Sequence, residues 1–261
     1  MTRSKTNMPF DLGGRVVLVT GASSGLGERF ARIAAASGAR VVAGARRIER
    51  LQQLHEEARG EGQDILPVAL DVTDEASVIA AFDAAEAAFG PVDTVIANAG
   101  INIAGSALGM SIEDFDSMSH VNFRGVFLTA REGARRMIAA GSAGRGTGRI
   151  LLISSITAHQ VADRAPIYCA TKAAVAQLGR ALARDWAMKG INVNVLCPGY
   201  IETEMNEHAW ELDGGKALLA SFPRRRIMEA SALDAMVLYL CSDASQQTTG
   251  SVLTIDDGQT L

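Results

Sequence analysis

The sequence predicts an α/β fold: a single doubly wound parallel sheet of seven strands with helices on both faces. Short apolar runs alternate with helical patterns along the chain, which is typical of strand–helix units that build a parallel sheet. These runs are apolar throughout, so the strands are expected to be buried on both faces. A chain of 261 residues suits one α/β domain, and we therefore expect a single domain over 1–261.

The first strand–helix–strand unit is predicted from an apolar run, a helical pattern and the glycines that end each of them. The β-branched run RVVLVT (15–20) reads as a strand that ends at Gly21. The periodic segment 25–37 reads as a helix that Gly38 closes, because glycine commonly follows a helix end. The run ARVVAGA that follows it (39–45) is the second strand.

The next two helices and strands follow the same alternation. Segment 47–59 is a charged helical pattern, and ILPVAL (65–70) is the third strand. The alanine-rich segment 75–89 predicts a helix that stops at a Gly-Pro pair, which cannot continue it. The fourth strand is VDTVIA (92–97).

A long helix is predicted over about 111–140. Ser111 opens it with Asp114 three residues later, which is a capping-box pattern. The glycine- and serine-rich segment 141–148 predicts a flexible loop, and RILLIS (149–154) is the fifth strand.

The last part of the chain supplies a helix, two strands and one long connection. Segment 168–188 is helical, INVNVL (191–196) is the sixth strand, and SVLTI (251–255) is the last. The stretch 200–230 lacks clear strand character and is long for a plain connection. Insertions of this kind often form lids or binding loops.

Composition excludes several classes of protein. The net charge of −4 and the pI of about 5.6 argue against a nucleic-acid binder, which usually carries a basic patch; the short run 224-RRR-226 is interpreted as a solvated loop. The polar lead 1–13 shows no secretory signal, and no apolar run is long enough to span a membrane. We therefore expect a cytoplasmic protein without a membrane partner. Its odd number of cysteines indicates reduced thiols, and its scattered histidines give no metal-ligand spacing.

A glycine-rich turn, 20-TGASSGLG-27, joins the first strand to the first helix. Glycines permit a tight turn and a close backbone approach. The N–H groups and the dipole at a helix start suit a pyrophosphate. Glycine turns also close ordinary loops, but this position between strand and helix is the context that a dinucleotide site requires.

The chain resembles the short-chain dehydrogenases/reductases from Arg15 to about Gly258, and the resemblance implies one Rossmann-type NAD(P)-binding oxidoreductase domain. The motifs that carry it, in the family's order, are 20-TGASSGLG-27, Asp71-Val72, 98-NAG-100, Asn122, Ser155, 168-YCATK-172 and 198-PGYIET-203. Without the resemblance, Asp71 is better interpreted as a helix-capping loop carboxylate and 98-NAG-100 as a simple turn. The family more often has Asn at position 97, where this chain has Ala97.

The resemblance assigns the nicotinamide cofactor a set of contacts along the carboxyl edge of the sheet. They are Gly21, Ser23, Ser24, Gly25, Leu26, Gly27, Ala45, Arg46, Asp71, Val72, Asn98, Ala99, Gly100, Tyr168, Lys172, Pro198, Gly199, Ile201 and Thr203. An acid at the end of the second strand would select NAD, but the chain has Ala45-Arg46-Arg47 there. Arg46 can pair a phosphate bidentately, which favours NADP(H) over NAD(H). The alternative is that both arginines merely begin a solvated helix, and Ser24 stands where many NADP-dependent members have a basic residue.

Tyr168 and Lys172 are four residues apart and therefore share one helix face. An ammonium nearby would lower the pKa of the phenol, which is ordinarily about 10. Tyr168 would then exchange a proton with a carbonyl or alcohol oxygen. The alternative interpretation of such a spacing is an ordinary pair on the helix surface.

Two further catalytic residues are implied by the resemblance. Ser155, thirteen positions before Tyr168, would hold the substrate oxygen, with Ser154 as a rival that the family spacing rejects. Asn122 would hold a water that continues the proton path from Lys172. The alternatives are a strand-end cap for the serine and a satisfied polar residue between helices for the asparagine.

The substrate is expected to lie after Ser155 and against 200–222. The candidate contacts are Ser155, His159, Tyr168, Tyr200, Met205 and Trp210. This mixture suggests a medium-sized, partly apolar small-molecule carbonyl compound. Equally, Met205 and Trp210 would only pack the lid, and His159 would be a loop residue with no special role.

The resemblance also implies a homotetramer or homodimer, because family members associate through two long helices and the C-terminal strand region. The small residues Ala170, Ala173, Ala174 and Gly179 would allow close helix contact. At the C-terminus the chain reads Asp256-Asp257-Gly258, where many relatives have Asp-Gly-Gly, so the geometry of this end is expected to differ.

Three functions remain open at this point. The first is an NADP(H)-dependent oxidoreductase acting on a ketone or secondary alcohol, of the carbonyl or 3-ketoacyl reductase type. The second is a catabolic NAD-dependent alcohol or hydroxysteroid-type dehydrogenase. The third is a catalytically silent, cofactor-sensing regulator, against which the intact Ser155, Tyr168 and Lys172 argue.

Overall fold

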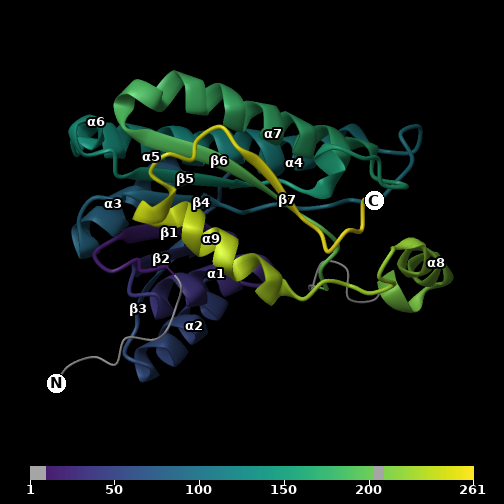
Figure 1. Cartoon of the computed structure of the whole chain (residues 1–261), viewed down its shortest axis with the longest axis horizontal. Coiled ribbons are helices and arrows are strands. Elements are labelled where there is room, and N and C mark those ends of the chain that lie inside the picture. The colour runs from purple at the N-terminus through teal and green to yellow at the C-terminus, as the bar shows by residue number, and fades with distance from the viewer. Residues whose placement is uncertain (1–9, 203–208) are drawn as a thin grey trace.

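The computed structural model, which describes residues 10–202 and 209–261, is a seven-stranded sheet with helices packed on both faces (Figure 1). Every strand pairs in parallel with its neighbours, in the order β3-β2-β1-β4-β5-β6-β7. The chain therefore winds outward from β1 in one direction and from β4 in the other, as a doubly wound sheet does. The predicted fold class is confirmed.

The elements lie close to the predicted segments. The strands are β1 (Val16–Thr20), β2 (Arg40–Ala45), β3 (Asp64–Ala69), β4 (Thr94–Ala97), β5 (Gly148–Ile153), β6 (Ile191–Pro198) and β7 (Val252–Ile255). The helices are α1 (Gly25–Ala36), α2 (Ile48–Gly60), α3 (Glu75–Phe89), α4 (Ile112–Ser119), α5 (Val126–Ala139), α6 (Ser142–Arg145), α7 (Pro166–Trp186), α8 (Asp213–Ser221) and α9 (Asp234–Cys241).

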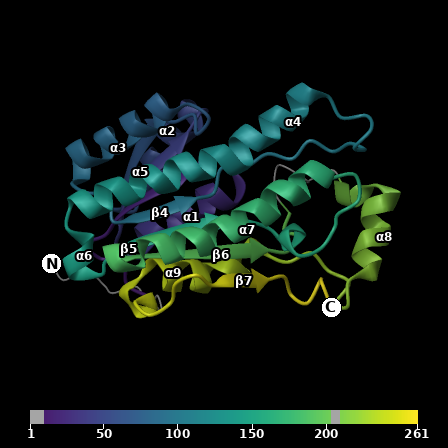
Figure 2. The same ribbon diagram turned by 90° about the horizontal axis from the view of Figure 1, so that it is seen from above.

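Two hydrophobic clusters hold the layers together, one on each face of the sheet. The first joins the sheet to α1, α2 and α9 through side chains such as Phe30 and Leu51. The second joins it to α3, α5 and α7 through Phe82, Met137 and Val175, and Figure 2 shows these three helices running across that face. All five side chains are buried. The strands are apolar throughout because both of their faces meet helices.

The long helix predicted over 111–140 is interrupted. Ser111 caps its start as predicted, since the Ser111 hydroxyl accepts a hydrogen bond from the Asp114 N–H at 3.0 Å. Between α4 and α5, however, residues His120–Gly125 form a π-helical segment. Such segments often occur at functional sites, and this one contains Asn122.

Segment 141–148, predicted as a flexible loop, instead contains the short helix α6. The connection 200–230, which was expected to lack strand character, contains α8. Both views place α8 at the end of the molecule toward which the strands point (Figures 1 and 2). Gly179 does not belong to an outward helix face: it packs on the sheet, where a Cβ would lie 2.2 Å from Val195 Cγ2.

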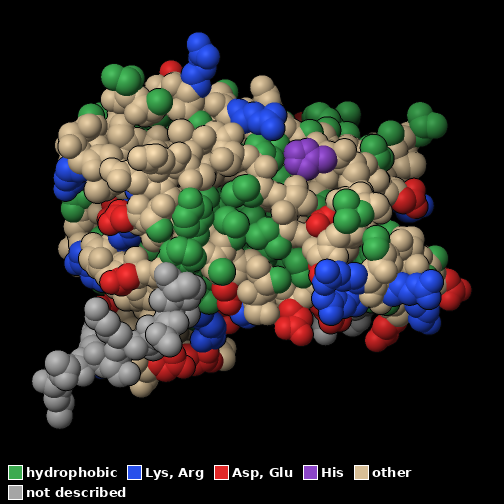
Figure 3. Space-filling view, viewed as in Figure 1, with side chains coloured by type: hydrophobic (Ala, Val, Ile, Leu, Met, Phe, Trp, Pro, Cys, Tyr) green, Lys and Arg blue, Asp and Glu red, His purple; other side chains and the backbone are tan. Residues whose placement is uncertain are grey.

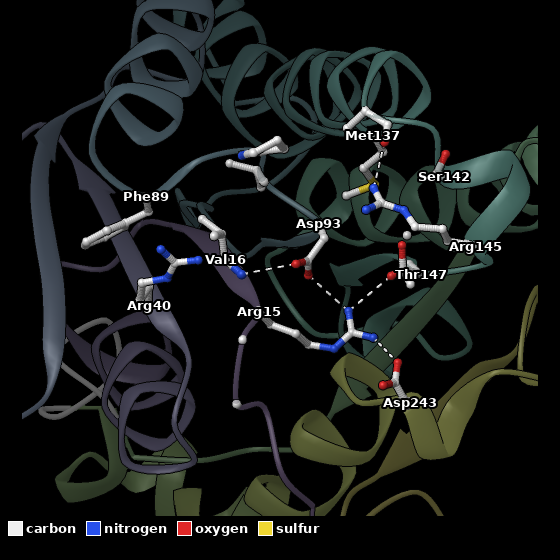
Figure 4. A pocket seen from close by; sticks show the side chains of 16 residues that line it. Arg15, Val16, Arg40, Phe89, Asp93, Met137, Ser142, Arg145, Thr147 and Asp243 are labelled. Carbon is white, nitrogen blue, oxygen red and sulfur yellow. Dashed lines mark hydrogen bonds and ion pairs between the residues drawn. The ribbon is translucent and has the colours of Figure 1, made fainter.

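The amino ends of the strands carry a buried charge network around a cavity of about 350 Å³ (Figure 4). Arg15 is buried there and donates hydrogen bonds to Asp93 Oδ1 at 3.0 Å and to the Thr147 carbonyl at 3.1 Å. It also pairs with Asp243. Arg15 thus connects β1 to three segments that are far away in the sequence.

Neither a membrane-crossing helix nor a metal centre is found in residues 10–202 and 209–261. No helix there has both the length and the apolar character that a bilayer requires. No three His, Cys, Asp or Glu side chains in those ranges are grouped as metal ligands would be.

Candidate active site

The predicted site residues gather at the carboxyl ends of the central strands. The first residues after β1 and β6 are Gly21 and Gly199, while Asn98 follows β4 and Ser155 follows β5 closely. Helix α7 begins beside this edge and carries Tyr168 in its first turn. Doubly wound sheets bind ligands at this edge, next to the switch in strand order.

The glycine-rich turn has the geometry that a pyrophosphate cradle requires. Gly21 has a φ of +69°, and a Cβ on it would lie 2.9 Å from Ala99 Cα. A Cβ on Gly27 would lie 2.2 Å from the Gly21 carbonyl oxygen. The N-cap residue of α1, Ser24, makes no side-chain capping bond, so the N–H groups of the first turn are available to an external anion. These residues fit a bound dinucleotide phosphate.

Thr20 fastens the end of β1 to the end of β4. Its Oγ1 accepts hydrogen bonds from the N–H groups of Asn98 and Ala99, both at 3.0 Å. The Asn98 side chain returns a bond from Nδ2 to the Thr20 carbonyl at 3.0 Å. Thr20 is buried, and its hydrogen bonds therefore hold the ends of β1 and β4 together beneath the glycine-rich turn.

The end of β2 presents exposed cations. Ala45 is buried, whereas Arg46 and Arg47 are exposed. Arg47 reaches back to the glycine-rich turn and donates to Ser23 Oγ at 3.2 Å and to Ser24 Oγ at 2.6 Å. This contact was not anticipated from the sequence.

Asp71 is not the helix cap that the simplest interpretation suggested. Asp74 caps α3, accepting from the Ala76 N–H at 3.0 Å. Asp71 Oδ1 instead accepts from the Thr73 N–H at 2.9 Å and from the Thr73 hydroxyl at 2.8 Å. These bonds lower the pKa of Asp71, and Arg46 acts in the same direction. Neighbouring Val72 is buried.

Tyr168 and Lys172 face the end of β5. Lys172 is buried, with 4% of its surface exposed, and its ammonium donates to the Ile153 carbonyl at 3.1 Å. The distance from Lys172 Nζ to the centre of the Tyr168 ring is 5.5 Å. The alternative of an ordinary pair on the helix surface is therefore wrong.

The protein's own groups do not lower the pKa of Tyr168, contrary to expectation. Burial raises that pKa to about 12, against which a hydrogen bond with Ser155 acts only in part. Burial also lowers the pKa of Lys172 to about 8. Desolvation penalises the charged form of each group and is the largest cause of both shifts.

The structure separates the two rival serines. Ser155 is half-buried, and its side chain bonds to Tyr168 and accepts from the Thr157 N–H at 3.2 Å. Ser154 is buried and donates to the Lys172 carbonyl at 2.7 Å. Ser154 thus anchors α7 to β5, whereas Ser155 is the serine beside the phenol.

Asn122 links three elements from within the π-helical segment. Its amide accepts from the Ile101 N–H at 2.8 Å and donates to the Ile101 carbonyl at 2.8 Å. It also donates to Thr171 Oγ1 at 3.2 Å. A Cβ built on Gly100 would lie 3.5 Å from Asn122 Oδ1 and 3.4 Å from Lys172 Nζ, so both polar atoms flank Gly100.

An aromatic cluster of Tyr200, Phe222 and Trp210 stands on the substrate side. The Tyr200 ring stacks on Phe222 with centroids 5.5 Å apart and meets the Trp210 ring edge-on at 5.6 Å. Trp210 Nε1 is buried and has no hydrogen-bond partner in the described part of the chain. Burial raises the pKa of Tyr200. Predicted residue His159 is exposed at the end of a short turn.

The remaining predicted contacts differ in what the structure says of them. Ile201 has a buried side chain that packs in the core, and its backbone forms a parallel bridge with Met228. Gly199 lies tightly against the C-terminal tail, because a Cβ there would meet Gln259 Oε1 at 2.4 Å. Thr203 and Met205 lie outside the described residues.

Sequence reasoning missed Thr20, Thr171 and Gln259. Thr20 and Thr171 belong to motifs that the resemblance already quoted, so their polar side chains inside those motifs were the available signal. Gln259 follows the unusual Asp256-Asp257-Gly258 sequence, which marked this end as different without indicating what it contacts.

Comparisons with known proteins agree with this geometry. Residues 15–213 match the family model described as short chain dehydrogenase. D-Threitol dehydrogenase of Mycolicibacterium smegmatis is 35% identical over 252 residues, covering 97% of this chain and 95% of that protein. Gluconate 5-dehydrogenase of Gluconobacter oxydans is 35% identical over 253 residues, covering 97% of each.

A solved structure shares the whole architecture. It is a gluconate 5-dehydrogenase from Burkholderia cenocepacia in complex with NADP and tartrate. It superposes with a TM-score of 0.90 at 35% sequence identity, covering 96% of this chain and 97% of that one. The match extends over the sheet, both helical layers and the site edge.

Proposed function

Because the chain belongs to the short-chain dehydrogenase family, whose members act on alcohols and ketones, we propose that it is an NADP(H)-dependent oxidoreductase. It transfers a hydride between the nicotinamide and a ketone or secondary alcohol. The observation that carries the proposal is the grouping of Tyr168, Ser155 and Lys172 at the carboxyl edge of the sheet, with Lys172 Nζ 5.5 Å from the phenol ring.

Each side chain has a distinct task. The bound nicotinamide supplies or accepts the hydride. Ser155 donates a hydrogen bond to the substrate oxygen and holds it beside the Tyr168 hydroxyl. Tyr168 gives its proton to that oxygen during reduction and removes it during oxidation.

Lys172 supports the proton transfer in two ways. A positive charge this close to the phenol stabilises the phenolate that forms when Tyr168 gives up its proton. The pKa of Lys172, lowered to about 8 by burial, lets the ammonium exchange protons near neutral pH. Asn122 hydrogen-bonds to Ile101 and Thr171 around Gly100, and so fixes the positions of these residues beneath the phenol.

NADP(H) is the proposed cofactor. Arg46 is exposed at the end of β2 with no acid beside it in the sequence, and a guanidinium there pairs with a 2′-phosphate. The similar gluconate 5-dehydrogenase structure contains NADP, which supports this choice. Arg47 bridges to Ser23 and Ser24 and stiffens the turn beside the phosphate.

Replacing Arg46 by aspartate tests the cofactor assignment. We expect the NADPH-over-NADH preference in kcat/KM to fall by about 100-fold, because a charge-assisted pair becomes a repulsion. Arg59→Asp, in the last turn of α2, the helix that follows Arg46, is the matched control and keeps the preference. An unchanged preference in Arg46→Asp means that another residue recognises the phosphate.

The substrate is a small molecule with a secondary hydroxyl or a ketone. D-Threitol and gluconate, in the names of two relatives, favour a polyhydroxylated compound. Tyr200, Phe222 and Trp210 favour a partly apolar one, which would lie against their rings. The buried Trp210 Nε1, which has no partner among residues 10–202 and 209–261, adds one donor to this wall.

A homo-oligomer is the proposed assembly. Ile112, Phe115 and Phe123 expose 69%, 42% and 40% of their surfaces on α4 and the π-helical segment that follows it. Strand β7 is an edge strand, and hydrophobic side chains gather over the middle of the face that contains it (Figure 3). The two surfaces lie on opposite sides of the molecule (Figure 2), so a separate copy would cover each, and light scattering would give the mass of the assembly.

A substrate panel tests the proposed function. The purified protein is mixed with NADPH or NADH and a set of ketones, and with NADP⁺ or NAD⁺ and the matching alcohols, threitol and gluconate included. Absorbance of the reduced nicotinamide reports turnover. Binding of NADPH without turnover of any of these compounds would favour a cofactor sensor over an enzyme.

A further inference from the structure

The C-terminal tail reaches the substrate side of the proposed active site. After β7, residues 256–261 form a compact turn in which Asp256 accepts hydrogen bonds from the Gly258 and Thr260 N–H groups, both at 3.0 Å. This turn presents the side chain of Gln259, which is buried with 8% of its surface exposed. Gly199 lies directly against it, and any Cβ there would collide with Gln259 Oε1.

Gln259 binds both backbone groups of one residue, Tyr200. Its Oε1 accepts from the Tyr200 N–H at 2.6 Å, and its Nε2 donates to the Tyr200 carbonyl at 3.1 Å. The Met228 N–H donates to the same carbonyl at 3.1 Å. The backbone of Tyr200 is therefore fixed by a side chain 59 positions later in the sequence.

Tyr200 is the residue through which this contact would affect the reaction. Its ring stacks on Phe222 and meets Trp210, so the orientation of its backbone sets the position of the aromatic wall. Tyr200 lies two residues after the end of β6, and β6 pairs with β5, whose end Tyr168 and Lys172 face. A shift of Tyr200 would thus be felt by a substrate bound at Tyr168.

A second contact fastens the same tail to the segment that returns from α8. Asp257 has a φ of +54°, in the left-handed region, where a residue other than glycine is strained. Its carboxylate accepts from Arg224 at 2.9 Å and from Arg226 at 2.6 Å. The two arginines hold Asp257 in this conformation, and they keep Gln259 against Tyr200.

We propose that Gln259 is a positioning residue: from the C-terminal tail, it fixes Tyr200 beside Tyr168 and so sets how tightly the substrate is held. This inference rests on the proposed function. Gln259 touches none of the reacting atoms, and of the assigned cofactor contacts Gly199 lies against it. Its two hydrogen bonds go to Tyr200, so its loss acts mainly on substrate binding. It also explains why a glycine is required at position 199, where the tail approaches most closely.

The test compares Gln259→Met, which keeps the length of the side chain but removes both bonds, with Gln259→Glu, which keeps the acceptor and loses the donor. Thr260→Val is the matched control, because the Thr260 hydroxyl bonds only to Asp256 in the same turn. The substrate is the best compound from the panel. KM, kcat, the Kd for NADPH and the melting temperature are measured for each variant.

We expect KM for the substrate to rise about tenfold or more in both Gln259 variants, as a misplaced contact of ordinary strength predicts, while the Kd for NADPH stays within twofold. Thr260→Val should keep the KM of the unmodified protein. A KM within twofold in either folded variant overturns the proposal, and so does an equal weakening of substrate and NADPH. An unmodified protein that turns over nothing would refute the proposed function itself, which is a separate result.

Discussion

Tyr168 is the residue that we propose to exchange a proton with the substrate, and the other site residues surround its phenol. Its hydroxyl bonds to Ser155, and the ammonium of Lys172 lies 5.5 Å from its ring. Burial alone makes this phenol a weaker acid than a free tyrosine, with its pKa raised to about 12. The proton transfer we propose therefore depends on positive charge beside the ring, because the Ser155 hydrogen bond favours the phenolate less than burial disfavours it.

Removing that hydroxyl gives the most direct test at the residue scale. Tyr168→Phe should lower kcat by about 10³-fold, which is the usual contribution of a general acid. NADPH should still bind with an unchanged Kd, measured by fluorescence, because the ring and the glycine-rich turn remain. Tyr239→Phe is the matched control, since the Tyr239 hydroxyl bonds to Thr248; that variant should keep its turnover. Comparable activity in both variants would remove Tyr168 from the mechanism.

Lys172 predicts a dependence of stability on pH. Burial lowers its pKa to about 8 from an ordinary 10.5. Between these values the unfolded chain binds the proton and the folded chain does not, so the free energy of unfolding rises with pH. Below pH 8 both states hold the proton and this contribution is flat. The full rise is about 3 kcal/mol.

Lys172→Met isolates this contribution from other titrating groups. Tyr168 and Cys241, whose pKa values are raised to about 12 by burial, act in the opposite direction but are present in both proteins. Urea unfolding at pH 7, 8.5 and 10 gives the stability of each. The unmodified protein should gain stability relative to Lys172→Met as pH rises; a constant difference would mean that the lysine titrates normally.

At the scale of elements, the regular strands and amphipathic helices were predictable because their signals are local. Helix α3 occupies the predicted residues because Asp74 caps one end and a Gly-Pro pair stops the other. Helix α9 was missed because it is apolar on most sides and packs within the core, so it lacks a periodic face. The π-helical break was equally hidden, since it involves bonds from Asn122 to Ile101 and Thr171 on other elements.

The candidate site divides in the same way. The spacing of Tyr168 and Lys172 is a helical signal that can be read from the sequence. The roles of Thr20 and Gln259 cannot be read from the sequence, because their hydrogen-bond partners lie 78 and 59 positions away. The burial that shifts both pKa values is also a property of the folded chain. Local spacing, together with the family resemblance, selected the residues that we propose to react, and tertiary contacts decide how they are held.

The packing of α7 on β6 is a feature that one substitution can test. A Cβ on Gly179 would lie 2.2 Å from Val195 Cγ2, and the helix carrying Tyr168 would be pushed outward. Gly179→Ala should lower the free energy of unfolding by about 1–3 kcal/mol, as overpacked cores do. Gly60→Ala, at the end of α2 with open space around it, should be neutral or slightly stabilising.

A compensating change makes the cause explicit. Gly179→Ala combined with Val195→Ala removes the colliding methyl group, and the two changes should then be less destabilising together than the sum of each alone. Unfolding in urea measures all four proteins. If the changes in the free energy of unfolding of the two single variants simply add up in the double variant, the destabilisation by Gly179→Ala does not come from its contact with Val195.

At the scale of the whole molecule, the two edges of the sheet have different tasks. The carboxyl edge holds the glycine-rich turn, the proton-transfer group and the aromatic cluster. The amino edge holds the network of Arg15, Asp93 and Asp243, together with Arg149, which is buried and donates to the Ser242 carbonyl at 3.1 Å. Charge at the first edge would serve the reaction that we propose, whereas charge at the second joins distant segments (Figure 4).

This division predicts that stability can be lost without loss of catalysis. Arg15→Met should lower the free energy of unfolding by about 2 kcal/mol, because Asp93 and the Thr147 carbonyl lose a buried donor. The cost stays moderate because the Asp243 side chain is 84% exposed, so water can solvate it when the arginine is gone. Arg15→Lys keeps the charge but cannot make the forked contacts. Its free energy of unfolding should therefore lie between those of the unmodified protein and Arg15→Met.

Urea unfolding and turnover on the same samples separate the two edges. At a temperature where each variant is folded, kcat and the KM for NADPH should equal those of the unmodified protein, because the glycine-rich turn and Tyr168 lie at the opposite ends of the strands. A folded Arg15→Met protein with reduced kcat would show that the amino edge acts on the site through the strands. Unchanged stability would show that the network around Arg15 adds nothing to the fold.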